Sequence, residues 1–233
     1  MQVRMAIIPA RGGSKRIPRK NIKNFCGKPI IAWSIEAALA SNCFDRVIVS
    51  TDDPEIELIA KQWGAEVPFM RPASLADDYA GTNIVVRHAI SVMAEQGEFP
   101  DFVCCIYATA PFIQVYDLKR GLELLIKSGS DFAFSVTSFP FPIQRAVKLT
   151  ENGRVAMFFP EHVSSRSQDL EETYHDAGQF YWGRAQAFLD DIPTFSEAAV
   201  PVILPRYRVQ DIDSLEDWHQ AELLFQLMLC KTD

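Results

Sequence analysis

The sequence of 233 residues lacks the short motifs that mark many nucleotide-binding and hydrolytic enzymes. It has no G-x-x-x-x-G-K-[ST], which disfavours a P-loop nucleotidase, and no G-x-G-x-x-G, which disfavours a dinucleotide-dependent oxidoreductase. It also has no G-x-S-x-G nucleophile elbow and no H-E-x-x-H zinc motif. The four histidines are scattered and offer no metal cluster, and His88 on a predicted helix is more typical of a structural residue.

An excess of positive charge, long apolar runs and paired cysteines are absent too. The 23 Lys and Arg against 30 Asp and Glu give a net charge of −7, which disfavours general nucleic-acid binding. No apolar run approaches the roughly 18 residues of a membrane span, and the N-terminus reads as a strand, not a cleavable signal. The five cysteines lack Cys-x-x-Cys spacing, which favours reduced thiols: Cys26, Cys43, Cys104, Cys105 and Cys230. We therefore expect a cytoplasmic protein that contacts neither nucleic acid nor membrane.

What the chain does have is an alternation of apolar runs with amphipathic segments. Strands are expected at 3–8, 46–50, 66–69, 102–108 and 132–138, and later at 179–182 and 201–204. Helices are expected at 29–41, 54–63, 82–96, 116–127 and 214–229. This alternation predicts an α/β fold with a three-layer, doubly wound, mostly parallel sheet, in a single domain spanning residues 1–233.

One stretch, residues 139–176, interrupts the alternation. It opens with Phe139-Pro140-Phe141-Pro142, and two short β-like pieces flank the hairpin signal Asn152-Gly153. Its aromatic residues are typical of a contact surface. We expect an inserted, projecting β-rich module at about 139–176 that forms a dimer contact.

The most informative segment is a cationic loop between the first strand and the first helix. It holds six cations without an acid, and the rest of the chain holds 17 cations against 30 acids: Arg11, Lys15, Arg16, Arg19, Lys20 and Lys23. Gly12 and Gly13 carry no side chain that would keep an anion from the backbone N–H groups. Ligands of such folds bind beyond the carboxyl ends of the strands, so the loop predicts an anionic ligand. A solvated basic loop is the alternative.

A second constellation lies near the C-terminus, in Gln210-Asp211-Ile212-Asp213. In extended backbone, residues two apart point to the same face, so Asp211 and Asp213 present paired carboxylates while Ile212 faces the core. Such hard oxygens suit Mg²⁺, which completes its coordination with water and phosphate. The alternative is that Asp213 caps the last helix with Glu216 as its partner.

Together these residues resemble the CMP–sialic acid synthetase family, the cytidylyltransferases of nine-carbon 2-keto acid sugars. The opening motif is specific and the others corroborate it, in order along nearly the whole chain: Pro9–Lys15, Lys20-Asn21, Gly27–Pro29, Ser50–Asp52, Arg71-Pro72 and Asp211–Asp213. The resemblance implies a GT-A-like nucleotidyltransferase fold, CTP and an acidic sugar as substrates, Mg²⁺ as cofactor, and a homodimer formed through the projecting module.

The resemblance also implies roles for individual residues. The CTP phosphates and the loop around them would involve Ala10, Arg11, Gly13, Ser14, Lys15, Lys20 and Asn21, and the cytidine would contact Arg71 and Thr82. The catalytic set would be Arg11, Lys15, Lys20 and Asp211, with Asp211 and Asp213 holding the metal. The sugar would meet Ala108, Thr109, Arg166, Gln168 and Gln179. Arg71 as a surface ion pair, Thr82 as a helix cap and Arg166 as a dimer contact are the alternatives.

Two departures from the sialate-activating members bear on the sugar. Ala108 stands where those members have Gln, and His175-Asp176-Ala177-Gly178 stands where they have an Arg-Pro-Asn-Gly-type run. Losing those polar groups suits a deoxy sugar with a methyl terminus, since a pocket discriminates strongly through its polar partners. The combination resembles the pseudaminic acid branch, which would supply bacterial surface or flagellar glycans. A synthetase for sialic, legionaminic or 3-deoxy-manno-octulosonic acid, a GT-A glycosyltransferase, and a non-catalytic nucleotide-binding protein are the alternatives.

Overall fold

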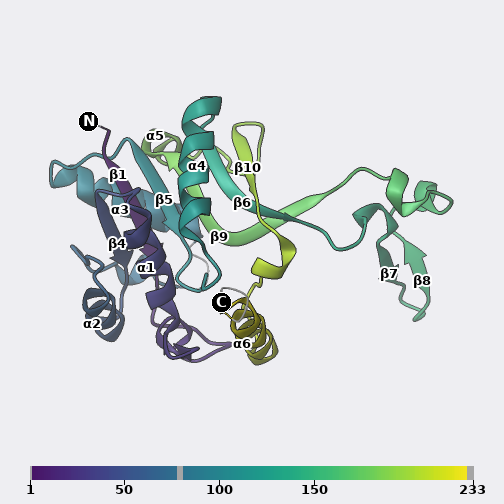
Figure 1. Cartoon of the computed structure of the whole chain (residues 1–233), viewed down its shortest axis with the longest axis horizontal. Helices are drawn as coiled ribbons and strands as arrows, with labels where there is room; N and C mark the ends of the chain where they lie inside the picture. Colours follow the sequence, from purple (N-terminus) through teal and green to yellow (C-terminus); the bar gives the residue numbers. More distant parts are fainter. Residues whose placement is uncertain (1, 78–80, 230–233) are drawn as a thin grey trace.

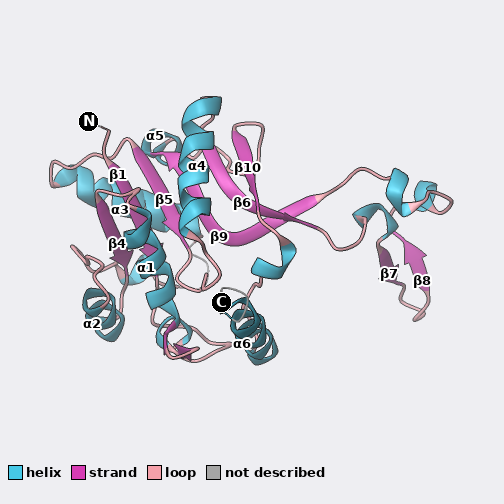
Figure 2. Cartoon of the chain, in the orientation of Figure 1, coloured by secondary structure: helices cyan, strands magenta, loops and turns pink. Residues whose placement is uncertain are grey.

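A computed structural model describes residues 2–77 and 81–229 and arranges them around a six-stranded sheet (Figures 1 and 2). The strand order is β10-β6-β9-β5-β1-β4. These strands are β1 (Arg4–Pro9), β4 (Arg46–Ser50), β5 (Phe102–Ile106), β6 (Phe132–Ser138), β9 (Tyr174–Arg184) and β10 (Ala199–Ile203). β1 runs parallel to β4 and β5, and β10 runs parallel to β6, whereas β9 is antiparallel to both of its neighbours. The predicted mostly parallel sheet is confirmed, with β9 as the reversed strand.

Helices cover both faces of this sheet. They are α1 (Ile30–Ser41), α2 (Pro54–Gln62), α3 (Thr82–Glu95), α4 (Val115–Ser128), α5 (Ala185–Leu189) and α6 (Leu215–Leu229). α1 contacts α4 on the near face in Figure 1, and α3 contacts α5 on the far face. Short 3₁₀ helices are η1 (Lys20–Ile22), η2 (Ala73–Leu75), η3 (Ile143–Arg145), η4 (Pro160–His162), η5 (Ser167–Asp169) and η6 (Arg206–Arg208).

Local sequence explains where several helices begin and end. Asp53 accepts hydrogen bonds from two N–H groups in the first turn of α2, and Pro54 occupies the position that needs no N–H donor. α4 ends at Gly129, whose φ of 71° lies in the left-handed region that favours glycine. These signals place the helices close to their predicted ranges.

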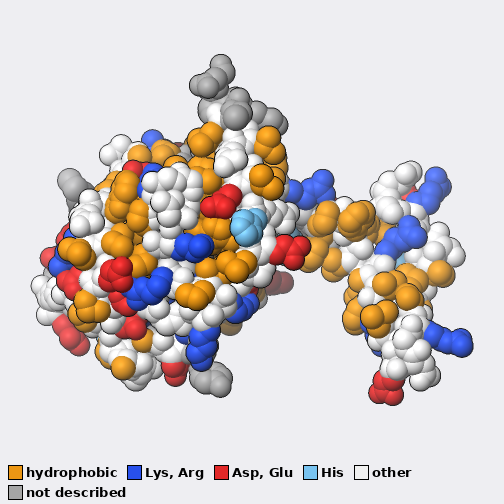
Figure 3. Space-filling model, turned by 90° about the horizontal axis from the view of Figure 1, so that it is seen from below, with side chains coloured by type: hydrophobic (Ala, Val, Ile, Leu, Met, Phe, Trp, Pro, Cys, Tyr) orange, Lys and Arg blue, Asp and Glu red, His pale blue; other side chains and the backbone are white. Residues whose placement is uncertain are grey.

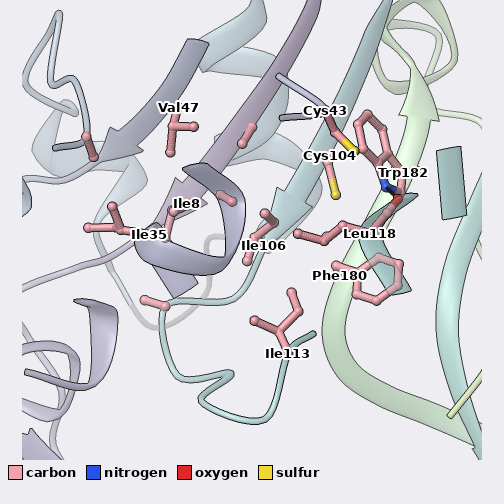
Figure 4. Packing of buried hydrophobic residues seen from close by; sticks show 14 of the residues in the cluster. Ile8, Ile35, Cys43, Val47, Cys104, Ile106, Ile113, Leu118, Phe180 and Trp182 are labelled. Carbon is pink, nitrogen blue, oxygen red and sulfur yellow. Dashed lines mark hydrogen bonds between the residues drawn. The ribbon is translucent and has the colours of Figure 1, made fainter. Parts of the chain in front are cut away.

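The largest core residue, Trp182 on β9, joins the sheet to α4. Its indole N–H donates to the Leu118 carbonyl at 3.0 Å, and its ring stacks on Phe44 with centroids 4.8 Å apart. Figure 4 shows Cys43 and Cys104 beside this ring. Since Trp182 is fully buried, the packing between β9 and α4 depends on its shape.

A separate cluster attaches α6 to the end of the sheet that carries the cationic loop. Ile17 from the loop is buried with Phe112, Ile212 and Trp218, and Phe225 completes the contact. A two-stranded ribbon, β2 (Asn24–Phe25) with β3 (Lys28–Pro29), lies between the loop and α1. The loop is therefore fixed on one side by α6 and on the other by the start of α1.

Between β6 and β9 the chain leaves the main body as a projecting arm. Ser138 pairs with Tyr174, so the arm comprises residues 139–173 of the range in which we expect an inserted module. Its ribbon consists of β7 (Val147–Leu149) and β8 (Val155–Met157). Apolar side chains gather on the arm (Figure 3), and the most exposed of them are Phe141, Leu149, Val155 and Val163.

The structure corrects several predicted elements. In place of the strand expected at 66–69, Glu66 forms an isolated bridge to Ile48 of β4 and Met70 forms another to Thr51, and α5 was not expected. The range 179–182 is the centre of a longer strand whose direction is reversed. In the residues that the structure describes, no helix is both long and apolar enough to cross a membrane.

Candidate active site

A cavity of about 260 Å³ opens where β1 and β5 end. Nine residues predicted for the site line it: Arg11, Ser14, Lys15, Lys20, Asn21, Arg71, Thr82, Ala108 and Thr109. Pro9, Arg16, Ile17, Val85 and Tyr107 complete the wall. The structure therefore brings most of the predicted nucleotide residues together, although they come from four separate segments of the chain.

The cationic loop is held in place by carboxylates that follow β4. Asp52 accepts a hydrogen bond from the Gly12 N–H at 3.1 Å. The Arg19 guanidinium donates to both oxygens of Asp53 and, at 2.6 Å, to Glu55. These contacts hold the pKa of Asp53 at about 2, mainly through the hydrogen bond from Arg19. Arg19 is thus an anchor of the loop and does not line the cavity.

Gly12 is required at its position for packing. A Cβ atom on Gly12 would lie 2.4 Å from Oδ2 of Asp53, which is itself tied to Arg19 and α2. The expectation that the Gly12 N–H is open to an anion is wrong, because Asp52 accepts from it. Gly13 is exposed and Ala10 is buried with its N–H on the Ser50 carbonyl, and neither lines the cavity.

Arg71 is a buried cation at the back of the cavity, with an exposed fraction of 6%. Its guanidinium donates to the Ser50 carbonyl at 2.8 Å and to the Leu75 carbonyl at 3.3 Å. Burial, followed by the charge of Arg11, lowers the pKa of Arg71, while Asp52 opposes the shift. Arg71 is therefore not a surface ion pair, and its charge belongs to the cavity.

The carboxylate pair adjoins the same cavity through Lys20. The Lys20 ammonium donates to the Ile212 carbonyl at 2.7 Å and lies 3.4 Å from Asp213. Arg16 donates to the other oxygen of Asp213 at 2.7 Å. Ile212 is buried, as the alternation predicts. Partial burial and the charge of Asp213 raise the pKa of Asp211.

The capping alternative for Asp213 is wrong. Asp217 accepts from the N–H groups of Asp213 and Ser214, and Ser214 in turn accepts from the Asp217 N–H. This reciprocal pair occupies the start of α6, so the carboxylates of Asp211 and Asp213 are not used for capping there. Two neighbouring carboxylates, of which Asp211 has a pKa raised by burial and by the charge of Asp213, form a donor set that fits Mg²⁺.

A second cavity, of about 430 Å³, adjoins the first because Thr82 and Tyr107 line both. The hydroxyl groups of these two residues lie 3.3 Å apart. Its remaining lining residues are Gly81, Asn83, Cys105, Asp176, Tyr181, Pro193, Thr194 and Phe195. No Lys or Arg is among these ten, so the second cavity is apolar and weakly acidic where the first is cationic.

Three predicted sugar residues lie elsewhere. Arg166 and Gln168 are on the arm, where the exposed Arg166 pairs with Asp169 at 3.3 Å, and Figure 1 shows the arm extending away from the main body. Gln179 is buried within β9, and its amide donates to the Arg208 carbonyl at 2.5 Å. None of these three side chains lines either cavity of the same chain. Arg166 and Gln168 lie on the arm, and β9 turns Gln179 into the core.

Several residues of the site had no individual role predicted from sequence. Asp52 and Asp53 follow a predicted strand and lie at the edge where ligands bind, so their position was a usable signal. Tyr107, which separates the two cavities, follows β5 in the same way. Asp176 lies in the run of residues that the resemblance connects with the sugar, but its approach to Thr82 was not predictable because it depends on the reversed direction of β9.

Comparison with known proteins agrees with this geometry. A family model described as cytidylyltransferase matches residues 5–210. A pseudaminic acid cytidylyltransferase of Campylobacter jejuni is 48% identical over 223 residues, covering 96% of each chain. A CMP-N,N'-diacetyllegionaminic acid synthase of Legionella pneumophila is 31% identical, again over 96% of each chain. The chain belongs to the cytidylyltransferase family, and it is accordingly a nucleotidyltransferase.

Among solved structures, a CMP:2-keto-3-deoxy-manno-octonic acid synthetase complexed with CTP has a similar fold. Its TM-score is 0.71 at 17% identity, and the match covers 97% of this chain and 100% of that one. A 4-diphosphocytidyl-2C-methyl-D-erythritol synthase from Anaerococcus prevotii matches with a TM-score of 0.63 at 11% identity, over 97% of this chain and 99% of its own. At these identities the likeness is one of fold.

Proposed function

We propose that this enzyme transfers the CMP group of CTP to pseudaminic acid, releasing pyrophosphate, in the synthesis of bacterial surface glycans. The observation that carries the proposal is the convergence of Arg11, Lys15 and Lys20 on one cavity next to a carboxylate pair. The 48% identity to a pseudaminic acid cytidylyltransferase supports this sugar. The lower identity to the legionaminic acid enzyme makes that sugar the second candidate.

The residues of the first cavity account for the charges of the reaction. The anomeric hydroxyl of the sugar loses its proton, which is released to solvent, and its oxygen forms a bond to the α-phosphorus of CTP as the bond to the pyrophosphate oxygen breaks. Arg11, Lys15 and Lys20 offset the charge of the triphosphate and of the leaving pyrophosphate. The buried charge of Arg71 and the hydroxyl of Thr82 hold the nucleoside end, so the two reactants meet with their phosphate and hydroxyl aligned.

We also propose that Asp211 and Asp213 hold a Mg²⁺ ion. When bound, the ion would supply positive charge at the phosphates beyond that of the lysines. Lys20 and Arg16 keep the Asp213 carboxylate oriented, and Asp211 keeps an exposed position beside it. Asp211→Asn is expected to raise the Mg²⁺ concentration needed for half-maximal rate, whereas Glu216→Gln, on the neighbouring turn, leaves it unchanged.

The reaction is tested by pyrophosphate release from CTP and Mg²⁺, with pseudaminic, legionaminic and sialic acids supplied separately. Release that is fastest with pseudaminic acid supports the proposal. Faster release with legionaminic or sialic acid keeps the reaction and replaces the sugar. CTP binding without release with any of the three overturns the proposed transfer.

We infer that two copies of the chain associate through the arm, which is rich in exposed apolar side chains. In a twofold dimer, the arm of one copy can carry Arg166 and Gln168 to the cavities of the other. This arrangement accounts for the position of both residues on an arm that extends away from the main body (Figure 1). It also gives the exposed Arg166 an acidic sugar as its ligand.

Mixing two inactive variants tests this arrangement. Lys20→Ala and Arg166→Ala are expected to be inactive alone. Randomly mixed dimers would have about a quarter of their sites intact, because half of the dimers are mixed and one site of each is complete. Recovery of activity supports the crossed arms, and a mixture as inactive as its components rules them out.

Four free cysteines among the described residues agree with our proposal that the enzyme works in the reducing cytoplasm.

A further inference from the structure

Asp176 lies at an irregularity of β9 that faces the second cavity. The pairing of β6 with β9 shifts register between Phe134 and Val136, opposite this part of the strand. Gly178 has a φ of 60°, in the left-handed region that favours glycine. Such bulges redirect side chains and are common beside active sites. Here the irregularity turns the Asp176 carboxylate into the wall of the cavity.

Two donors fix that carboxylate. Oδ2 accepts from the Tyr181 hydroxyl at 2.5 Å, and Oδ1 accepts from the Gly178 N–H at 2.9 Å. Burial raises the pKa of Tyr181 well above its usual range, so this hydroxyl remains a donor. The Tyr181 ring is held between Tyr107 and Phe134, with centroids at 5.3 and 5.9 Å. Asp176 is therefore oriented before any ligand enters.

The carboxylate retains capacity for a ligand. Each carboxylate oxygen has two acceptor positions, and each oxygen of Asp176 receives one of the hydrogen bonds above. Among the described residues that line the second cavity there is no Lys or Arg, so a substrate donor can approach without competing with a cation from them. Pro193 and Phe195 also line this cavity and offer it apolar side chains.

The charges of the two cavities orient an acidic sugar. Its own carboxylate is attracted to the cationic first cavity and repelled by Asp176, which keeps the uncharged end of the sugar in the second cavity. Acylamino substituents combine an N–H donor with an apolar methyl group, and this pairing matches a cavity that is lined by both Asp176 and Phe195. A hydrogen bond to a charged acceptor is stronger than one between neutral groups.

We propose that Asp176 is a specificity-determining residue that accepts a hydrogen bond from the amide N–H of an acylamino group on the sugar. This inference rests on the proposed function, because it requires an acidic, acylated sugar as substrate. It gives a positive role to a position at which the resemblance implies proline in the sialate-activating members. Proline at this position would offer no acceptor to the cavity, so the residue distinguishes sugars by their donors and not only by their size.

The test is a cycle that combines one change in the enzyme with one change in the sugar. The enzymes are wild type and Asp176→Ala, and the sugars are pseudaminic acid and the analogues in which either acylamino group is replaced by hydrogen. For one analogue, wild type is expected to lose roughly 10- to 100-fold in kcat/KM, the range of a hydrogen bond to a charged group. Asp176→Ala is expected to lose less than about threefold for that analogue, with KM for CTP unchanged.

Glu172→Gln is the matched control, because Glu172 also accepts from a tyrosine hydroxyl, that of Tyr174, on an exposed part of the chain. It is expected to behave as wild type. Equal losses for wild type and Asp176→Ala with both analogues would overturn the inference, as would a raised KM for CTP with unaltered sugar preference. Failure of wild type to release pyrophosphate with pseudaminic acid would instead overturn the proposed function. Thermal melting of each variant separates lost contacts from lost folding.

Discussion

Arg208 and Asp117 form an ion pair in the interior of the protein, with 2.5 Å between nitrogen and oxygen and exposed fractions of 5% and 1% for the side chains. The pair ties η6 to the first turn of α4. Tyr116 contributes its hydroxyl to the same guanidinium, and Gln179 donates to the Arg208 carbonyl. Asp211 follows Arg208 by three residues, so this network also fixes the position of the backbone that leads into Asp211 and Asp213.

Breaking this pair on one side is expected to destabilise the fold strongly. Arg208→Met leaves Asp117 as a buried charge without its partner, a change that costs about 3–5 kcal/mol in comparable cases. The double variant Arg208→Met with Asp117→Leu removes both charges and is expected to recover most of that loss. Chemical denaturation measures both free energies of unfolding. If the double variant is no more stable than Arg208→Met alone, the loss of stability does not come from the unpaired charge of Asp117.

The contact of Asp53 with Arg19 predicts a dependence of stability on pH. The pKa of Asp53 is lowered from 3.8 to about 2 in the folded protein, so its ionised form stabilises the fold above about pH 4. That contribution, about 2 kcal/mol, is lost as the pH falls from 4 toward 2. Asp53→Asn keeps an acceptor for the start of α2 but removes the charge. Its deficit in unfolding free energy is expected at pH 7 and should vanish near pH 2, and a deficit independent of pH would contradict this account.

Much of the sheet was predictable because its strands are short apolar runs between polar loops. The predicted ranges 46–50 and 132–138 match β4 and β6, and residues of β5 are buried throughout, as expected for a strand covered on both faces. The first cavity was predictable for a related reason. Most of its residues follow β1 or β5, whose carboxyl ends meet at one edge of the sheet, so their positions in the chain bring them together.

Features that depend on distant pairing were not predictable. The direction of β9 is set by its pairing with β5 and β6, and nothing in its own residues encodes that direction. Gln179 was therefore assigned to the sugar although it faces the core. Arg166 and Gln168 were assigned to the sugar from the resemblance, although both lie within the module that was expected to project. The second cavity was missed because Asp176 and Thr82 meet only through the folded sheet.

Gly121 provides a test of packing between α4 and β9. A Cβ atom there would lie 2.7 Å from Cδ1 of Trp182 and 3.0 Å from the ring of Phe180, and both rings are buried. Overpacking of this kind costs about 1–3 kcal/mol, which exceeds the gain of about 1 kcal/mol from alanine in a helix. Gly121→Ala is thus expected to lower the thermal midpoint. Gly97→Ala would serve poorly as a control because of its positive φ, whereas the exposed Gly81 has no atom within 4 Å of a Cβ. A Gly121→Ala midpoint at or above that of Gly81→Ala would show that α4 can move away.

Lys20 and Lys23 lie within a single turn, and we expect the charge of Lys20 to act in catalysis and that of Lys23 to be structural. Lys20 lines the first cavity and contacts Asp213, whereas Lys23 lies over the ring of Trp218, 5.3 Å from its centroid, and does not line the cavity. Loss of one charge that stabilises a transition state typically lowers kcat by about 10²- to 10³-fold. We expect a loss of that size for Lys20→Ala and less than about threefold for Lys23→Ala, measured by pyrophosphate release at saturating CTP. Equal losses would mean that the net charge of the loop matters more than the position of Lys20. In that case the response of the two variants to salt would be the same, since a diffuse charge is screened over about 10 Å at 0.1 M ionic strength.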